Sequence, residues 1–93
     1  MLKQQSVGQA PESKLKTLVV LSAFVRDEEG ELRPAFEPRE LPSADKAKMD
    51  ARRLAAQGIY AGVISWSRSA DLVNGEFGDP VVLFQHGDVP DME

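Results

Sequence analysis

The pattern of apolar residues along the chain centres on one segment, residues 17–25, which reads Thr-Leu-Val-Val-Leu-Ser-Ala-Phe-Val. β-Branched and aromatic residues over this length are typical of a buried strand. Apolar side chains occupy both faces of the expected strand, as they do in strands covered above and below. We therefore predict a central strand over about residues 15–26. Alternation places on one face Val19, Leu21, Ala23 and Val25, and on the other Leu18, Val20 and Phe24.

A turn and a second strand are predicted directly after this central strand. Residues 27–30 combine three acidic residues with Gly30, a composition typical of a hairpin turn. In residues 31–40, mostly apolar side chains then alternate with mostly charged ones, and the segment contains Pro34 and Pro38. Because proline cannot donate a hydrogen bond to a central ladder, we predict that this second strand lies at an edge of the sheet.

A helix is predicted over residues 44–57. Ser43 is a favourable N-cap residue, and Gly58 suits the left-handed position that ends many helices. The apolar residues recur at helical spacing and form one stripe, which consists of Ala44, Ala47, Ala51, Leu54 and Ala55. A stripe made mostly of alanine allows a close approach to a sheet, and Leu54 is its expected main anchor.

Two more strands are predicted, over residues 60–67 and residues 81–85. Small side chains in the first suit a position beneath the alanine-rich helix. This assigns to the helix side Ala61, Val63 and Ser65, and to the opposite face Tyr60, Ile64 and Trp66. The connection over residues 69–80 contains Asn74-Gly75, a strong hairpin-turn dipeptide, so it is either a long loop or a short two-stranded ribbon.

These elements predict a single small α+β domain in the order β-β-α-β-β. We expect a four-stranded, mostly antiparallel sheet with one helix packed on one face. The expected strand order is 2-1-3-4, and the alternative is 2-1-4-3. The domain should span residues 14–90, after a polar N-terminal tail of residues 1–13 that we expect to be disordered and before a loose C-terminus of residues 91–93.

Composition and charge narrow the class of partner. The 93 residues are 42% hydrophobic and 28% charged, as in ordinary globular domains. The net charge of −4 argues against a nucleic-acid partner, which usually requires a basic surface. No segment approaches the roughly 20 apolar residues that span a bilayer, and the first residues lack the apolar segment of a signal peptide. We therefore expect a cytoplasmic protein without a membrane partner.

His86 is the single histidine and the first candidate for chemistry. A serine–histidine–acid set can be written with Ser65, Ser67 or Ser69 and with Asp71, Asp79 or Asp88. No G-x-S-x-G elbow surrounds any of these serines, so we predict that the protein is not an enzyme.

Metal and cofactor sites are equally poorly supported. His86 with Asp79 and Asp88 offers few ligands, and the chain has no cysteine. The acidic residues 27–31 lack the spacing of a calcium-binding loop. No glycine-rich phosphate motif precedes a helix. We therefore predict no metal and no cofactor.

The favoured interpretation is a small interaction module that self-associates through an apolar sheet face. One helix covers one face of a small sheet, and apolar side chains left bare on the other face indicate an interface. The predicted binding surface contains Phe24, Tyr60, Ile64, Trp66 and Arg68. A homodimer with two-fold symmetry is the expected assembly, or else a complex with another protein. The alternative is a small ligand-binding protein or enzyme that uses a cleft near Trp66, Arg68 and His86.

Overall fold

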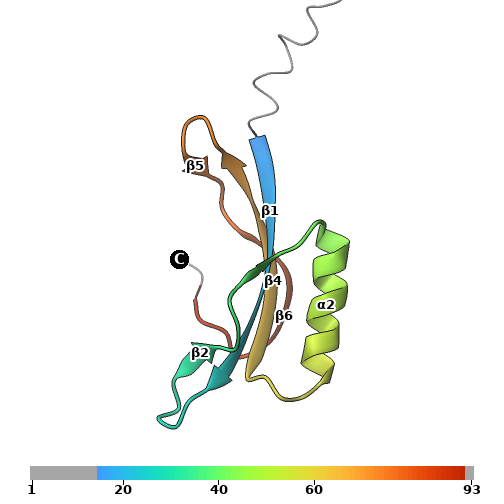
Figure 1. Ribbon diagram of the computed structural model, residues 1–93, viewed down its shortest axis with the longest axis vertical. Helices are drawn as coiled ribbons and strands as arrows, with labels where there is room; N and C mark the ends of the chain where they lie inside the picture. The colour runs from blue at the N-terminus through green and yellow to red at the C-terminus, as the bar shows by residue number, and fades with distance from the viewer. Residues whose placement is uncertain (1–14, 92–93) are drawn as a thin grey trace, which may run out of the picture.

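A computed structural model describes residues 15–91, in which a curved antiparallel sheet carries one helix on one face (Figure 1). The predicted α+β class is confirmed. The elements follow in the order β1 (Leu15–Arg26), β2 (Leu32–Pro34), β3 (Arg39–Glu40), α2 (Ala44–Ala56), β4 (Gly62–Asp71), β5 (Glu76–Phe77) and β6 (Val81–Gly87). The predicted disordered tail lies outside the described residues, as do the last two residues of the predicted loose C-terminus.

The two longest strands, β1 and β4, pair with each other and form the centre of the sheet. Their register runs from Leu15 opposite Asp71 to Phe24 opposite Gly62. The short strands β2 and β3 both pair with the outer side of β1, whereas β5 and β6 both pair with the outer side of β4. Every pairing is antiparallel. The predicted order 2-1-3-4 is therefore confirmed, with the proline-bearing segment at an edge.

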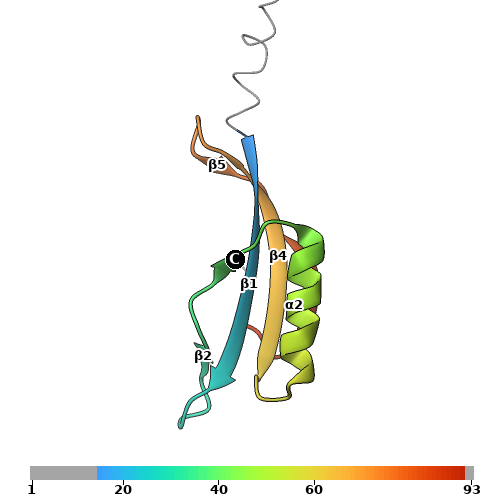
Figure 2. The same cartoon turned by 45° about the vertical axis from the view of Figure 1, so that its right-hand side comes forward.

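The core lies between the sheet and α2, which packs against β1, β4 and β6 (Figure 2). A cluster of completely buried side chains occupies this layer, namely Leu21, Ala23, Ala51 and Val63. Ser65 is also completely buried on this face. Small side chains on both the helix and the strand let the two backbones approach closely, as the alanine stripe predicts.

The helix begins and ends where its capping residues predict. The Ser43 Oγ accepts a hydrogen bond from the backbone N–H of Lys46 at 3.1 Å, which satisfies one of the free donors of the first turn. Gly58 takes a φ of 72°, and its N–H donates to the carbonyl of Ala55. Leu54 is only partly buried, so it anchors the helix together with the completely buried alanines rather than alone.

The prediction of one continuous second strand is wrong. Residues 35–38 bend between β2 and β3, and Pro34 and Pro38, which cannot donate to a ladder, bracket the bend. The segment nevertheless stays close to β1, because the N–H of Ala35 donates to the carbonyl of Ala23 at 2.8 Å. The bend turns Phe36 towards the core on the helix side, where it packs edge-to-face against Tyr60.

The face predicted for Tyr60 is also wrong. β4 begins only at Gly62, so the strand alternation does not extend back to Tyr60, which packs against the core on the helix side. Phe84 packs against the same core because it lies opposite the buried Ser65. Both aromatic side chains therefore enlarge a core that the alanine-rich helix alone would leave small.

Of the two alternatives for the connection after β4, a long loop and a short ribbon, the structure has the short ribbon. β4 continues to Asp71 and pairs there with β5. The Asp71 Oδ1 accepts hydrogen bonds from the N–H groups of Val73 and Asn74, and Gly75 takes a φ of 71°. The Asn74 side chain donates to Asp71 Oδ2, and this hydrogen bond lowers the pKa of the Asp71 carboxyl. We name residues 71–77 the β4–β5 ribbon.

Candidate functional site: the open face of the sheet

The sheet face opposite α2, which we name the open face, carries a row of mostly apolar side chains. The strand pairing places Val20 opposite Trp66, and Val82 opposite Trp66 on the other side. Leu18 lies opposite Arg68 in the next cross-strand pair along the same face. The open face includes Leu18, Val20, Phe24, Ile64, Trp66, Arg68 and Val82, with the polar Ser22 and Gln85 on either side of Ile64. It follows directly from a central strand that is apolar on both sides.

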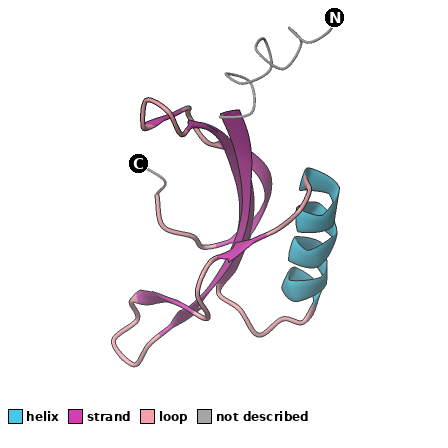
Figure 3. Ribbon diagram, turned by 45° about the horizontal axis from the view of Figure 1, so that its top comes forward, coloured by secondary structure: helices cyan, strands magenta, loops and turns pink. Residues whose placement is uncertain are grey.

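The side chains of the open face differ in how far they reach solvent. Ile64 is only 4% exposed, whereas Trp66 is partly buried and Val82 is 50% exposed. Figure 3 shows that the helix covers the other side of the sheet, so the burial on this face comes from other parts of the chain.

The β4–β5 ribbon borders one end of the open face and projects from the sheet on the side away from α2 (Figures 1 and 2). Arg68 holds its base. The Nε of Arg68 donates to the carbonyl of Gly78 at 2.9 Å, and its guanidinium carbon lies 5.5 Å from the centre of the Phe77 ring. A shallow pocket of 570 Å³ lies beside the ribbon, between Phe77 and Lys16. Arg68, predicted as a binding residue, therefore has an internal role in fixing the ribbon.

The chain after β6 borders the other end of the open face. Gly87 takes a φ of 74°, and the N–H of Asp88 donates to the carbonyl of Ala61 at 2.9 Å. The Asp88 carboxylate then pairs with Arg26. The next residues run along the open side, where Val89 and Pro90 line a groove of 200 Å³ together with Ile64, Val82, Gln85 and Asp91. This return of the chain accounts for much of the burial of Ile64.

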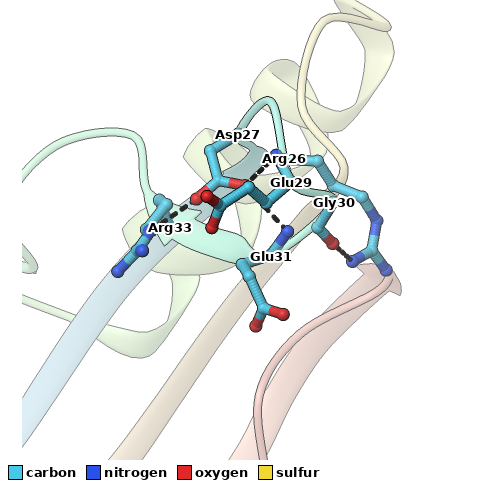
Figure 4. A network of polar contacts seen from close by, with 6 residues as sticks. All are labelled: Arg26, Asp27, Glu29, Gly30, Glu31 and Arg33. Carbon is cyan, nitrogen blue, oxygen red and sulfur yellow. Dashed lines mark hydrogen bonds and ion pairs between the residues drawn. The ribbon is translucent and has the colours of Figure 1, made fainter.

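The acidic hairpin tip is a turn built on one carboxylate (Figure 4). The Asp27 Oδ1 accepts hydrogen bonds from the N–H groups of Glu29 and Glu31, both at 2.9 Å. Its Oδ2 accepts from Arg33 Nε at 2.8 Å, and this hydrogen bond is the main reason that the pKa of Asp27 is lowered. Both oxygens of Asp27 are thus used to hold the turn. Within residues 15–91, no group of three or more histidine, aspartate or glutamate side chains is placed to hold a metal ion.

His86 does not join Trp66 and Arg68 in one cleft. It lies opposite Val63, so its side chain belongs to the helix-bearing side of the sheet, at the exposed edge strand β6. Ser65, one of the candidate nucleophiles, is completely buried, and its hydroxyl has no hydrogen-bond partner among the described residues. The structure therefore separates the residues of the alternative cleft onto two faces.

Four of the five predicted binding residues share the open face, and Tyr60 is the exception. Sequence reasoning offered the β4–β5 ribbon as one of two alternatives for residues 69–80, and it missed the return of the chain at Val89–Pro90. The Asn74-Gly75 dipeptide was a usable signal for the ribbon. Gly87, two residues past the end of the strand predicted over residues 81–85, was a weaker signal for the return of the chain.

Comparison of the chain with protein-family models, with curated proteins and with solved structures gives no match. In the part of the chain that the structure describes, no helix has the length and apolar character needed to cross a membrane. Function is therefore inferred from the open face itself.

Proposed function

We propose that this protein is a small cytoplasmic interaction module that forms a homodimer by pairing the open faces of two copies. The observation that carries the proposal is the position of Trp66. It lies between Val20 on β1 and Val82 on β6, in an apolar row, and part of its surface remains accessible. Tryptophan is one of the residue types enriched among the residues that contribute most to binding at the centre of interfaces.

The charge of the open face also supports pairing with a second copy. The centre of the face, at Val20 and Trp66, carries no charged side chain. Arg68 is held by Gly78 and Phe77. Two identical apolar rows can therefore meet about a two-fold axis without placing like charges opposite each other.

The size of the face sets the expected affinity. Four strand positions about 4.8 Å apart give a sheet only about 19 Å wide, and the ribbon and the C-terminal residues border it at both ends. The total buried area would thus fall at or below the lower end of stable interfaces, which is about 1,200 Å². We therefore expect a weak dimer with a dissociation constant in roughly the micromolar range.

Light scattering after size exclusion tests the proposal at concentrations from about 10 μM to 500 μM, a range that brackets a dissociation constant of roughly 100 μM. The mass should rise from monomer to dimer. Because Trp66 is the single tryptophan, its fluorescence should shift to shorter wavelength over the same range. Leu18→Asp should suppress both changes, whereas Met49→Asp, at a 55% exposed position on the helix, should suppress neither. A monomeric mass throughout, with unchanged emission, would contradict face pairing.

Ligand binding is a second candidate, and the pocket beside the β4–β5 ribbon favours it. Polar side chains and Phe77 line this pocket, including Lys16, Asp71 and Glu76. A small polar molecule with an aromatic or apolar part would fit such a lining. A thermal-shift screen on wild type and Phe77→Ala tests this candidate, because a genuine ligand should raise the melting temperature of wild type only.

A further inference from the structure

The two edges of the sheet differ sharply in their protection against pairing. The β2/β3 edge is broken into strands of three and two residues, and it carries Pro34, Pro38 and several charged side chains. β6 is a seven-residue strand, Val-Val-Leu-Phe-Gln-His-Gly, without proline, lysine, arginine, aspartate or glutamate. Within residues 15–91, β4 is the one strand that pairs with β6. Proteins normally protect an exposed edge with short strands, prolines, charged side chains or bulges. β6 has one register shift, between its pairings with Ser65 and Trp66, and none of the other devices.

The backbone of β6 offers hydrogen-bonding groups along this outer edge. In an antiparallel pair, directly opposite residues alternate between those that bond to each other and those whose main-chain groups point apart. The N–H of Asp88 donates to the carbonyl of Ala61, so these opposite residues form a hydrogen-bonded pair. Two positions back, His86 and Val63 belong to the same class, and Gln85 and Ile64 therefore form a pair whose main-chain groups point apart. The N–H and C=O of Gln85 therefore point away from β4, towards the open edge.

The side chains of β6 are apolar on both faces at its first two residues. Val81 is 59% exposed and lies opposite Ser67, whereas Val82 is 50% exposed and lies opposite Trp66. Adjacent strand residues point to opposite faces. A further strand placed beside β6 would thus cover apolar surface on both sides and would also bind the backbone of Gln85.

We propose that β6 is a strand-pairing site and that its partner is β6 of a second copy, joined antiparallel about a two-fold axis. Charge favours this partner, because a strand without acidic or basic side chains other than His86 can meet itself without like-charge repulsion. The β2/β3 edge is a poor partner strand because it is short and interrupted by prolines, so we take a closed pair of β6 strands as the assembly.

This pairing uses the outer edge of β6, which meets the open face at Val82. Two perpendicular two-fold contacts, one through the open faces and one through β6, would together make a tetramer. Edge pairing alone would make a dimer with one continuous sheet.

Masses by light scattering at several hundred micromolar separate these assemblies. Val81→Lys and Gln85→Pro should each lower the assembly to half its wild-type mass. The lysine adds a charge at the edge, and the proline removes an N–H that β4 does not use. Val73→Lys, at a 63% exposed position in the ribbon, is the matched control and should keep the wild-type mass.

Amide exchange at Gln85 gives a second readout that does not depend on the open face. In wild type at high concentration, this amide should exchange about tenfold more slowly than in Val81→Lys, because pairing buries it. If the rates are equal, or if wild type is monomeric, edge pairing is overturned. If Leu18→Asp keeps the wild-type mass and Val81→Lys halves it, edge pairing stands and the proposed face pairing fails. Loss of half the mass in both variants supports the tetramer.

Discussion

The guanidinium of Arg68 lies across the ring of Phe77, with 5.5 Å between the guanidinium carbon and the ring centre. The same side chain donates to the carbonyl of Gly78. One arginine in the middle of β4 thus fixes the β4–β5 ribbon at the end of the open face.

Replacing Arg68 with alanine should loosen the ribbon more than the rest of the domain. The lost hydrogen bond and cation–π contact should lower the free energy of unfolding by about 1 kcal/mol. Amide exchange of Gly78, whose N–H donates to Ser69, should accelerate more than exchange in β1. Arg52→Ala, at an exposed position on α2, should change neither quantity. Equal acceleration throughout the sheet would show that Arg68 supports the whole fold.

Ser65 should be replaceable by alanine without loss of stability. Its hydroxyl is buried and has no hydrogen-bond partner within the described residues, so removing it relieves a desolvation cost. Urea denaturation should show an unfolding free energy that is unchanged or about 1 kcal/mol higher. Ser65→Val should instead cost about 1–3 kcal/mol, because the larger side chain overfills a tightly packed layer. A clear loss of stability in the alanine variant would contradict an unpaired hydroxyl.

Asp27 should make the fold sensitive to acid. Its folded-state pKa lies below 3.8, first because of the hydrogen bond from Arg33, so the ionised carboxylate favours the folded state. This contribution is complete above the unfolded-state pKa and is lost as the pH falls through the lower, folded-state pKa. Denaturation between pH 2 and pH 5, a range around the ordinary aspartate pKa, should show a steeper loss in wild type than in Asp27→Asn.

An NMR titration of Asp27 checks the cause of this shift. Arg33→Gln should return the Asp27 midpoint towards 3.8, whereas Arg39→Gln should leave it in place, because Arg39 instead lies over the Phe36 ring. A midpoint that stays low without Arg33 would assign the shift to the backbone N–H groups alone.

Gly62 should not tolerate a side chain. A Cβ at this position would overlap the backbone of Asp88, where the chain turns back along the open face. Gly62→Ala should therefore displace Asp88 and weaken the Asp88–Arg26 ion pair. We expect thermal denaturation at a lower temperature and faster amide exchange at Asp88. Gly30→Ala is a useful comparison, because it has open space around it but a φ of 85°, so it tests backbone strain alone.

The sequence predicts those parts of this fold that depend on local chemistry. The limits of β1, the cap at Ser43 and the edge position of the proline-bearing segment all follow from residues close together in the chain. The face of Tyr60 cannot be derived from the sequence, because Tyr60 lies in the loop before β4, where the alternation of a strand does not apply. The bend that turns Phe36 into the core, and the return of Val89 along the open face, depend on contacts between distant segments. For the site, the row on β1 and β4 and the short ribbon after β4 were predictable, but the return of the chain after β6 was not.

The pairing of β1 with β4 affects how this domain folds during its synthesis on the ribosome. β2 follows β1 within a few residues, whereas β4, the main partner of β1, begins about 40 residues after β1 ends. β1, the most apolar segment of the chain, therefore remains one strand of a hairpin, without its main partner strand, until the helix and β4 have been synthesised. Contacts so far apart in sequence slow folding, to milliseconds or longer in small β-rich domains. During that interval the nascent hairpin exposes both faces of β1, and a chaperone that binds extended apolar segments would have its best target there.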